Sequence, residues 1–145
     1  MGNRPEGPLK GLGGDQVEGR QAVRELLLAG TRRTREVLMA GDLDPAPILD
    51  DIIDLADEAR VTIREVSRSK FESVARTDAP QGVLALAQPL IEHELEDLLR
   101  PDASGRDPFL LLLDGVTDPG NLGAILRSAE CAGVTGVVLP RHRAA

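Results

Sequence analysis

Aromatic side chains are almost absent from the chain, which has two Phe and neither Tyr nor Trp among 145 residues. Hydrophobic residues still make up 41% of the sequence, which is enough to exclude a wholly disordered chain. Any core must therefore be built from Leu, Val, Ile and Ala. The scarcity of aromatic rings also disfavours modules that bind single-stranded RNA by stacking bases on aromatic side chains.

Cysteine and histidine are equally scarce. The one cysteine, Cys131, cannot form a disulfide within the chain, and with His93 and His142 it gives no metal-ligand spacing. We interpret Cys131 as a small packing residue and the two histidines as surface residues. No metal site is expected.

Long apolar runs are missing too. No segment approaches the roughly 20 apolar residues that span a bilayer. The N-terminal MGNRPEGPLKGLGGDQ lacks the apolar segment of a signal peptide. We therefore expect a cytoplasmic protein that does not contact membranes.

Positive charge is in deficit, with 17 Lys and Arg against 24 Asp and Glu, a net charge of −7. The net charge is −3 over residues 1–90, −4 over 91–107 and zero over 108–145. Salt screens exposed charges beyond roughly 8–10 Å, so local charge governs association better than the total does. The acidity disfavours nucleic-acid binding without excluding it.

Helical and strand patterns alternate over most of the chain. Residues 1–15 are rich in Gly and Pro and are interpreted as a disordered tail, and 16–90 as one domain. Three strands are predicted in this domain, over 34–40, 61–66 and 81–87. Three helices are predicted, over 19–29, from Asp44 or Pro45 to Arg60, and over 67–76, the last with a Ser69–Glu72 capping box. Helical spacing predicts burial of Val23, Leu26 and Leu27 in the first helix and of Ile48, Ile52, Leu55 and Ala59 in the second. This order predicts a compact three-layer α/β domain.

A second unit begins after an acidic linker at 91–107, of which 91–100 is predicted to be a short helix. FLLLLDGV (109–116) has the near-continuous apolar character of a buried strand. A TDPGN turn, a helix over 121–133 and a strand over 136–140 follow. Residues 108–145 thus form one βαβ unit, which cannot cover its own sheet.

The predicted helix of this unit has two distinct faces. Its apolar face carries Leu122, Ile125, Leu126, Ala129 and Gly133. The other face places Arg127 among very small residues: Gly120, Gly123, Ala124 and Cys131. Small residues let a ligand or another backbone approach, and Arg supplies a forked donor suited to phosphate. An equally acceptable interpretation is a surface helix that packs its small face on another subunit and leaves Arg127 solvated.

Asn121 lies off both faces. It belongs functionally with Arg127 only if it sits in the Asp118-Pro119-Gly120-Asn121 turn, as the residue that caps the helix. Capping alone would also explain it. The Gly-rich turn lacks the signatures of a P-loop and of a dinucleotide fingerprint, which disfavours a doubly wound nucleotide-binding protein.

DGVTDPGNLGAILRSAECAGVTGVVLP (114–140) resembles the first conserved motif of the SpoU/TrmH family of RNA ribose 2′-O-methyltransferases, which belong to the knotted SPOUT class. GRQAVRELL (19–27) and QGVLALA (81–87) resemble the L30e-like substrate-binding domain of that family. The resemblance covers roughly residues 17–145. It implies an α/β protein with an L30e-like domain at 16–90, followed by the first βαβ unit of a SPOUT (α/β knot) methyltransferase domain at 108–145.

The resemblance also implies a function. The expected activity is S-adenosyl-L-methionine-dependent (AdoMet-dependent) 2′-O-methylation of a ribose in structured RNA, with large-subunit rRNA as the expected partner and a homodimer as the full-length form. Arg127 and Asn121 match catalytic positions of the family, and Glu130 is a weaker candidate. Arg127 would fix a phosphate and stabilise the forming alkoxide, since its own pKa exceeds ~12 and makes it an awkward base.

Two departures from the family pattern stand out. Pro80 occupies the position before QGV, where the family commonly has His. The second and third family motifs, which supply the AdoMet loops, the knot and much of the dimer interface, are not found before Ala145. No AdoMet-binding residue is named, and the 145-residue chain alone is expected to be inactive.

An arginine-rich segment is the candidate for RNA capture. Residues 20–36 have a local net charge of +3 and contain the candidates Arg20, Arg24, Arg32, Arg33 and Arg35. The alternative is a solvated helix end. The competing interpretation of the whole chain is a non-catalytic L30e-like RNA-binding module.

Overall fold

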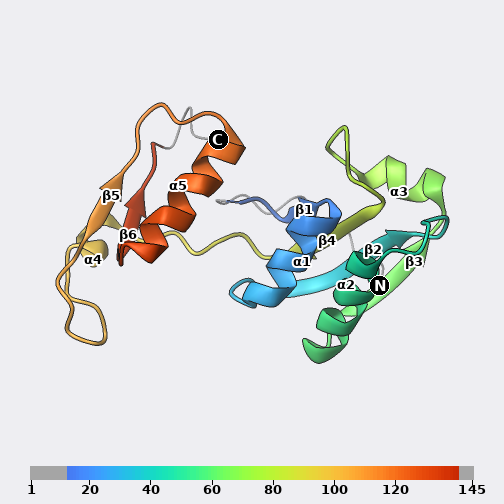
Figure 1. Cartoon of the computed structure of the whole chain (residues 1–145), viewed down its shortest axis with the longest axis horizontal. Coiled ribbons are helices and arrows are strands. Elements are labelled where there is room, and N and C mark those ends of the chain that lie inside the picture. Colours follow the sequence, from blue (N-terminus) through green and yellow to red (C-terminus); the bar gives the residue numbers. More distant parts are fainter. Residues whose placement is uncertain (1–12, 141–145) are drawn as a thin grey trace, which may run out of the picture. The chain divides into compact units, whose positions relative to one another are not determined.

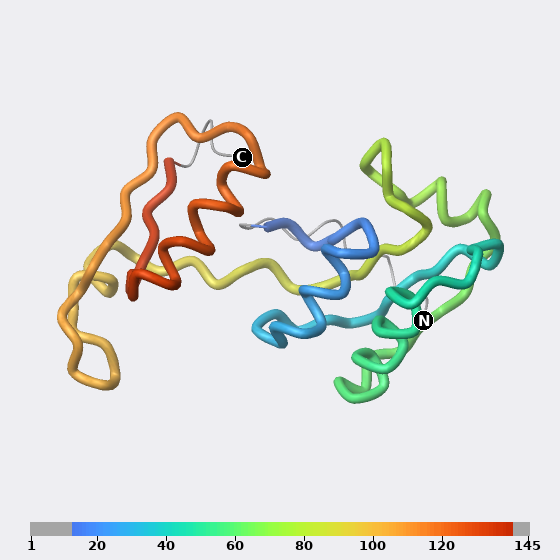
Figure 2. Tube along the Cα trace, in the orientation of Figure 1, coloured from blue at the N-terminus to red at the C-terminus, as the bar shows by residue number. Residues whose placement is uncertain are grey.

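The computed structural model describes residues 13–140. The chain forms two compact units, Met1–Glu92 and His93–Ala145 (Figures 1 and 2), and each is described by itself. His142 and residues 1–12 of the expected tail lie outside the described residues.

The first unit is built on a four-stranded mixed sheet. Its elements are β1 (Gln16–Glu18), α1 (Arg20–Ala29), β2 (Thr34–Ala40), α2 (Pro47–Glu58), β3 (Thr62–Val66), α3 (Arg68–Val74) and β4 (Val83–Ala87). The strand order is β1-β4-β2-β3, in which β2 and β3 are parallel and β4 runs antiparallel to both of its neighbours. The predicted α/β fold is confirmed.

Side chains alternate between the two faces of the sheet, so each face has its own core. Val37 and Met39 of β2 pack with α1 and α2, whereas Leu38 and Ala40 pack with Phe71 of α3. In β4, Val83, Ala85 and Ala87 face α1 and α2, and Leu84 faces α3. This period of two is what a strand requires. Two helices on one face and one on the other make the three predicted layers.

The helix predictions were right in type and partly wrong in detail. Val23, Leu26 and Leu27 of α1 are buried, as predicted. The α2 helix ends at Glu58, earlier than predicted, and Ala59 is exposed. Its buried residues are Leu49, Ile52 and Ala56, while Ile48 and Leu55 are partly buried. The predicted apolar stripe was therefore displaced by part of a turn.

The first turn of α3 is capped by a different serine from the one predicted. Ser67 is the N-cap, and its Oγ accepts a hydrogen bond from the Lys70 N–H at 3.3 Å. Ser69 lies inside the helix, so the predicted Ser69–Glu72 capping box was wrong. Ser67 follows β3 directly, and the earlier of the two serines therefore meets the first free amides.

Gly14 and Asp15, which the sequence assigns to the N-terminal tail, already contact the first unit. The Gly14 carbonyl accepts a 2.5 Å hydrogen bond from Arg32, and the Asp15 carbonyl accepts one from the Ala87 N–H at 3.0 Å. Asp15 is 6% exposed, and its carboxylate pairs with Arg76 at 2.7 Å. The unpredicted strand β1 follows directly. These contacts fasten the N-terminal segment to β4.

The second unit is a small βαβ element with one preceding helical turn. It comprises α4 (Leu95–Leu98), β5 (Leu110–Leu112), α5 (Pro119–Cys131) and β6 (Gly136–Val138). The strands β5 and β6 are parallel, with Leu110 opposite Gly136. Gly136 leaves space for Leu110 of β5 and for Leu98 of α4, because a Cβ there would lie 2.9 Å from a Leu110 methyl group and 3.3 Å from a Leu98 methyl group. Both strands and the acidic helix are shorter than predicted.

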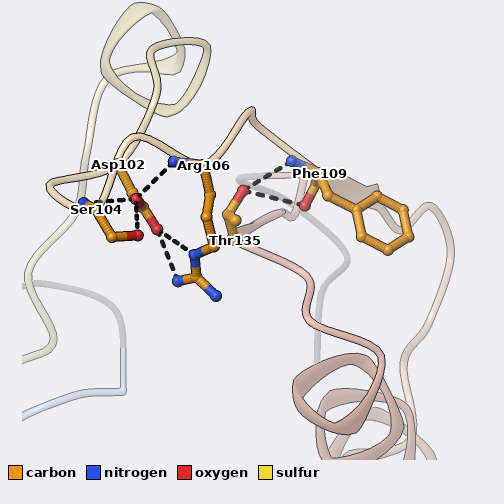
Figure 3. Close-up of polar contacts among 5 residues, drawn as sticks. All are labelled: Asp102, Ser104, Arg106, Phe109 and Thr135. Atoms are coloured by element: carbon orange, nitrogen blue, oxygen red, sulfur yellow. Dashed lines mark hydrogen bonds and ion pairs between the residues drawn. The ribbon is translucent and has the colours of Figure 1, made fainter.

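The side chains of Asp102 and Thr135 accept the hydrogen bonds that fix the segment before β5 and the start of this strand (Figure 3). The Asp102 carboxylate accepts hydrogen bonds from Ser104, at its N–H and hydroxyl, and from the Arg106 N–H, and it pairs with the Arg106 guanidinium at 2.7 Å. The Ser104 hydroxyl, then the Arg106 N–H, hold the pKa of Asp102 well below its usual range. Thr135 Oγ1 accepts the Phe109 N–H at 2.9 Å, which extends the β5–β6 ladder by one residue.

Much of the apolar surface of this second unit is uncovered. Phe109 is 54% exposed, Leu112 70% and Leu126 37%, and the sole buried apolar residue described in the unit is Ala129. On the predicted apolar face of α5, Ala129 is buried, Leu122 and Ile125 are partly buried, and Leu126 and Gly133 are exposed. This agrees with the expectation that one βαβ unit cannot cover its own sheet.

Candidate functional site

The N-terminus of α5 is closed by Asp118. Its Oδ1 accepts a 2.7 Å hydrogen bond from the Asn121 N–H, and Pro119 occupies the first helical position. Asn121 is therefore the third residue of the helix, and the interpretation of Asn121 as the N-cap was wrong. The physical reason lies in Pro119, whose fixed φ favours the first turn of a helix and places the cap one residue before it.

Arg127 is exposed and folds back along the small face of α5. A Cβ placed on Gly123 would lie 3.4 Å from Arg127 Nη1, so the guanidinium lies directly over this glycine. The arginine makes no hydrogen bond or ion pair with any described residue. The predicted small-residue face is thus present, and its one cation is available to a ligand.

Asn121 and Arg127 do not meet within the chain. Six helical positions separate them, which corresponds to roughly 9 Å along the axis and about one and two thirds turns, so their side chains point in directions about 120° apart. Arg127 points back over Gly123 rather than toward Asn121. Glu130 and Cys131 are both exposed, so the interpretation of Cys131 as a packing residue was wrong for the described part of the chain.

The five arginines proposed for RNA capture fall into two groups, of which the first is engaged within the protein. Arg20 Nε donates to the Gln81 carbonyl at 3.2 Å. Arg24 pairs with Asp51 at 3.0 Å and with Glu25 at 2.9 Å, and the hydrogen bond with Asp51 raises its pKa. These two guanidinium groups already have partners on neighbouring elements.

Arg32 is held most firmly. It donates to the Gln88 carbonyl at 2.7 Å and to the Gly14 carbonyl at 2.5 Å, and its partial burial lowers its pKa. It therefore joins the N-terminal segment to the end of β4. By contrast, Arg33 and Arg35 are exposed, and neither side chain makes a hydrogen bond or ion pair with a described residue.

A groove of about 860 Å³ lies in the first unit, at the end of the sheet opposite to Arg33 and Arg35. Arg20, Arg68, Phe71, Glu72 and Asp78 are among its lining residues. Arg68 pairs with Asp42 and with Glu72, and Arg20 donates to the Gln81 carbonyl, so both arginines of this groove already have partners.

Gln81 is a functional residue of the fold that sequence reasoning missed. Its side chain accepts the Arg20 N–H at 2.9 Å and closes the N-terminus of α1.

No helix in the described part of the chain is long and apolar enough to cross a membrane. Residues 13–140 also contain no group of three or more His, Cys, Asp or Glu side chains that could hold a metal ion.

The structure defines the class only as an α/β protein made of two units, and the family models match each of these units separately. Residues 16–92 match the family model for RNA 2′-O ribose methyltransferase substrate binding, and residues 108–145 match the SpoU rRNA methylase family. The chain belongs to the SpoU family of RNA 2′-O-ribose methyltransferases.

Individual relatives agree with this assignment. The chain is 36% identical over 140 residues to the 23S rRNA (guanosine-2′-O-)-methyltransferase RlmB of Photobacterium profundum, a match that covers 92% of this chain and 54% of the relative. A solved TrmH-family putative RNA methyltransferase from Porphyromonas gingivalis is 30% identical, with a TM-score of 0.55, over 90% of this chain and 45% of that one.

A third relative shares the fold. The SpoU methyltransferase AviRb of Streptomyces viridochromogenes, solved in complex with AdoMet, is 23% identical with a TM-score of 0.60, over 90% of this chain and 46% of that one. The chain thus spans about half the length of the relatives it matches.

Proposed function

We propose that this chain supplies the RNA-binding unit and the first catalytic segment of an enzyme that methylates the 2′-hydroxyl of a guanosine in 23S rRNA, with AdoMet as methyl donor. The observation that carries the proposal is Arg127, a free cation lying over Gly123 on the exposed face of α5. The 36% identity to a 23S rRNA guanosine 2′-O-methyltransferase supports the choice of substrate.

The chemistry requires a cation at the reacting hydroxyl. A ribose 2′-hydroxyl is a poor nucleophile at neutral pH, and it becomes negatively charged as its proton passes to solvent water. A guanidinium that binds the adjacent phosphate and faces the forming alkoxide stabilises that charge, whereas its own high pKa prevents it from taking the proton. Alignment of the hydroxyl with the methyl group contributes further, on the order of 7–11 kcal/mol for ideally placed reactants.

The glycine below Arg127 suits this role. Gly in a helix interior costs about 1 kcal/mol relative to Ala, so a helix built for stability alone would not favour it. At residue 123 it leaves the guanidinium close to the helix surface and lets an RNA backbone approach. Asn121, on another side of the helix, is proposed to contact the ribose rather than to orient Arg127.

AdoMet supplies an activated methyl group on a sulfonium when it is bound. The polar side chains that follow β5, namely Asp114, Thr117 and Asp118, do not by themselves make a site for a nucleoside of this size, and Asp118 already caps α5. We assign no residue of this chain to AdoMet and derive no step through it.

The test is methyl transfer to 23S rRNA by the longest translation product that contains this chain. Arg127→Ala is expected to lower kcat by on the order of 10²–10³, as removal of a transition-state donor does elsewhere. Arg127→Lys should recover little, because an ammonium cannot replace the planar fork. Arg100→Ala, which removes an exposed arginine paired with Asp97 at 3.3 Å, is the matched control.

The outcome separates the two functional hypotheses. Near-normal turnover by Arg127→Ala would contradict the catalytic assignment. An unmodified protein that binds rRNA but transfers no methyl group would favour the non-catalytic RNA-binding module.

A further inference from the structure

Three arginines of the first unit differ from all its other described arginines in having no partner. The remaining six donate to a carboxylate or to a backbone carbonyl: Arg20, Arg24, Arg32, Arg64, Arg68 and Arg76. Within residues 13–92, Arg33, Arg35 and Arg60 make no hydrogen bond or ion pair through their guanidinium groups, and all three are exposed.

The three free arginines lie at one end of the sheet, although 27 positions separate Arg33 from Arg60 in the sequence. Arg33 directly precedes β2, Arg35 is the second residue of β2, and Arg60 stands two residues before β3. The parallel register places Glu36 opposite Thr62, so the two segments start side by side. Strand spacing and chain geometry put the three Cα atoms within roughly 15 Å of one another. We call this group the arginine edge.

The backbone is irregular at two of these positions. β2 pairs with β4 through Thr34–Ala87 and Glu36–Leu86, so Arg35 is the extra residue of a β-bulge. Bulges of this kind turn a side chain in a new direction. Arg60 has a φ of 55°, at the position after a helix where Gly or Asn is usual. The helix dipole stabilises a cation at this position. This stabilisation does not by itself explain why a residue other than Gly or Asn adopts the strained backbone conformation.

Neighbouring acids form no ion pair with the described guanidinium groups of the arginine edge. Glu36, beside Arg35, pairs instead with Arg64 at 3.2 Å. Asp57 and Glu58, at the end of α2, make no ion pair with Arg60. A chain with a net charge of −7 thus presents three guanidinium groups without an ion pair together, whereas the arginines of the groove at the opposite end have hydrogen-bond or ion-pair partners.

We infer that the arginine edge binds the phosphates of the RNA substrate. This inference rests on the proposed function and assigns its RNA contact to residues Arg33, Arg35 and Arg60. Guanidinium groups suit phosphate oxygens, and such contacts position an RNA without reading its sequence. The Gln88 N–H donates to the Arg33 carbonyl at 2.9 Å, so the chain leaves this unit beside the same edge.

The test is the salt dependence of binding between the 145-residue chain and a fluorescein-labelled stem–loop of 23S rRNA. The triple variant Arg33→Gln, Arg35→Gln, Arg60→Asn removes the charges, and Asn keeps a residue that tolerates the left-handed backbone. The slope of log K against log salt is expected to fall by about 0.9 for each duplex phosphate that the variant no longer neutralises, or by roughly 2 to 3 in all. Circular dichroism should show an unchanged fold.

The matched control removes the same number of charges from paired arginines that are not candidates for RNA capture: Arg64→Gln, Arg68→Gln and Arg76→Gln. Its slope is expected to change little. Equal decreases of the slope in both triple variants, or a larger decrease in the control, would overturn the inference and assign RNA binding to total charge or to the groove. If the unmodified chain does not bind the RNA at all, the RNA-binding part of the proposed function fails, and the arginine edge fails with it. Normal binding with an unchanged slope in the test variant refutes the arginine edge alone.

Discussion

Gln81 closes the N-terminus of α1 by accepting the Arg20 N–H at 2.9 Å, across a sequence separation of 61 residues. The Gln81 carbonyl also accepts Arg20 Nε at 3.2 Å. Gly19, the residue at the N-cap position, supplies no side chain for this purpose. The helix that carries Val23, Leu26 and Leu27 into the core is therefore completed by the loop before β4.

Removal of this cap should destabilise the first unit. Gln81→Ala is expected to lower the free energy of unfolding by about 1 kcal/mol, the usual cost of losing an N-cap. Gln81→Glu keeps an acceptor and adds a negative charge at a helix N-terminus, so it should match or exceed the original stability. Urea unfolding followed by circular dichroism measures both, since the chain has no Trp or Tyr for fluorescence. Equal destabilisation by both substitutions would contradict the capping role.

Gly82 should tolerate no side chain. Its φ is 73°, and a Cβ there would lie 2.2 Å from a Leu43 methyl group, whereas Gly30, in the same unit, has a φ of 61° and no atom nearer than 4.0 Å. Gly30→Ala therefore carries only the cost of the left-handed backbone, about 1–2 kcal/mol. Gly82→Ala adds steric overlap and should cost the unit at least about 2 kcal/mol more. Thermal unfolding of the two variants compares them, and similar shifts in melting temperature would show that Leu43 moves aside freely.

Glu18 should make the first unit sensitive to acid. Burial alone would raise the pKa of Glu18, but hydrogen bonds from the Thr77 hydroxyl and from the Arg76 and Thr77 N–H groups lower it overall. Stability from a lowered carboxylate pKa is present above the unfolded value, ~4.3, and is lost as the pH falls through the folded value. Glu18→Gln should therefore be less stable at pH 7 and approach the original protein below about pH 4. Parallel stability curves across that range would contradict this.

Adjacent arginines should behave differently on truncation. Arg32→Ala removes two hydrogen bonds that hold the Gly14 and Gln88 carbonyls, and it is expected to cost about 1–3 kcal/mol. Arg33→Ala removes an exposed side chain without a partner and should change stability by less than about 0.5 kcal/mol. Denaturant midpoints measure both. A stable Arg32→Ala variant would show that these hydrogen bonds are dispensable.

Amide exchange should distinguish the sheets of the two units. β4 is paired on both sides and nearly all of its residues are buried, so it should exchange most slowly. β5 and β6 pair only with each other, and Leu112 is 70% exposed. Their amides are expected to exchange faster by orders of magnitude in the 145-residue chain, because opening them uncovers little more apolar surface. Peptide-level hydrogen–deuterium exchange measures the protection of the three strands. Protection of β5 and β6 comparable to that of β4 would mean that something covers the second sheet.

Local patterns could be predicted from the sequence, and contacts between distant residues could not. Val23, Leu26 and Leu27 share a helical face, and their burial follows from that periodicity alone. β1 has just one apolar residue, Val17, and it is a strand because β4 pairs with it. No pattern within three residues carries that information. The displaced stripe of α2 has a similar cause, since packing against β2 and α1 selects among several apolar positions.

The candidate site divides in the same way. The small face of α5 around Arg127 follows from helical spacing, so it could be predicted. The N-cap could not be placed securely, because Asp118 and Asn121 are both good caps and Pro119 decides between them. The predicted arginine cluster was defined by proximity in the sequence. In the structure Arg32 donates to backbone carbonyls of its own unit, and Arg60, from another segment, lies beside Arg33 and Arg35.

The strand order β1-β4-β2-β3 has a consequence for the newly made protein. β4, an inner strand of the sheet, is the last of its four strands to be synthesised. Until residues 83–87 emerge, β1 has no partner and the side chains of β2 lack a closed core on either face. Translation proceeds at about 5–20 residues per second, so a growing chain stays incomplete for several seconds. The first unit must therefore fold in one late step, and a pause just before residue 83 would prolong its exposure to chaperones and proteases.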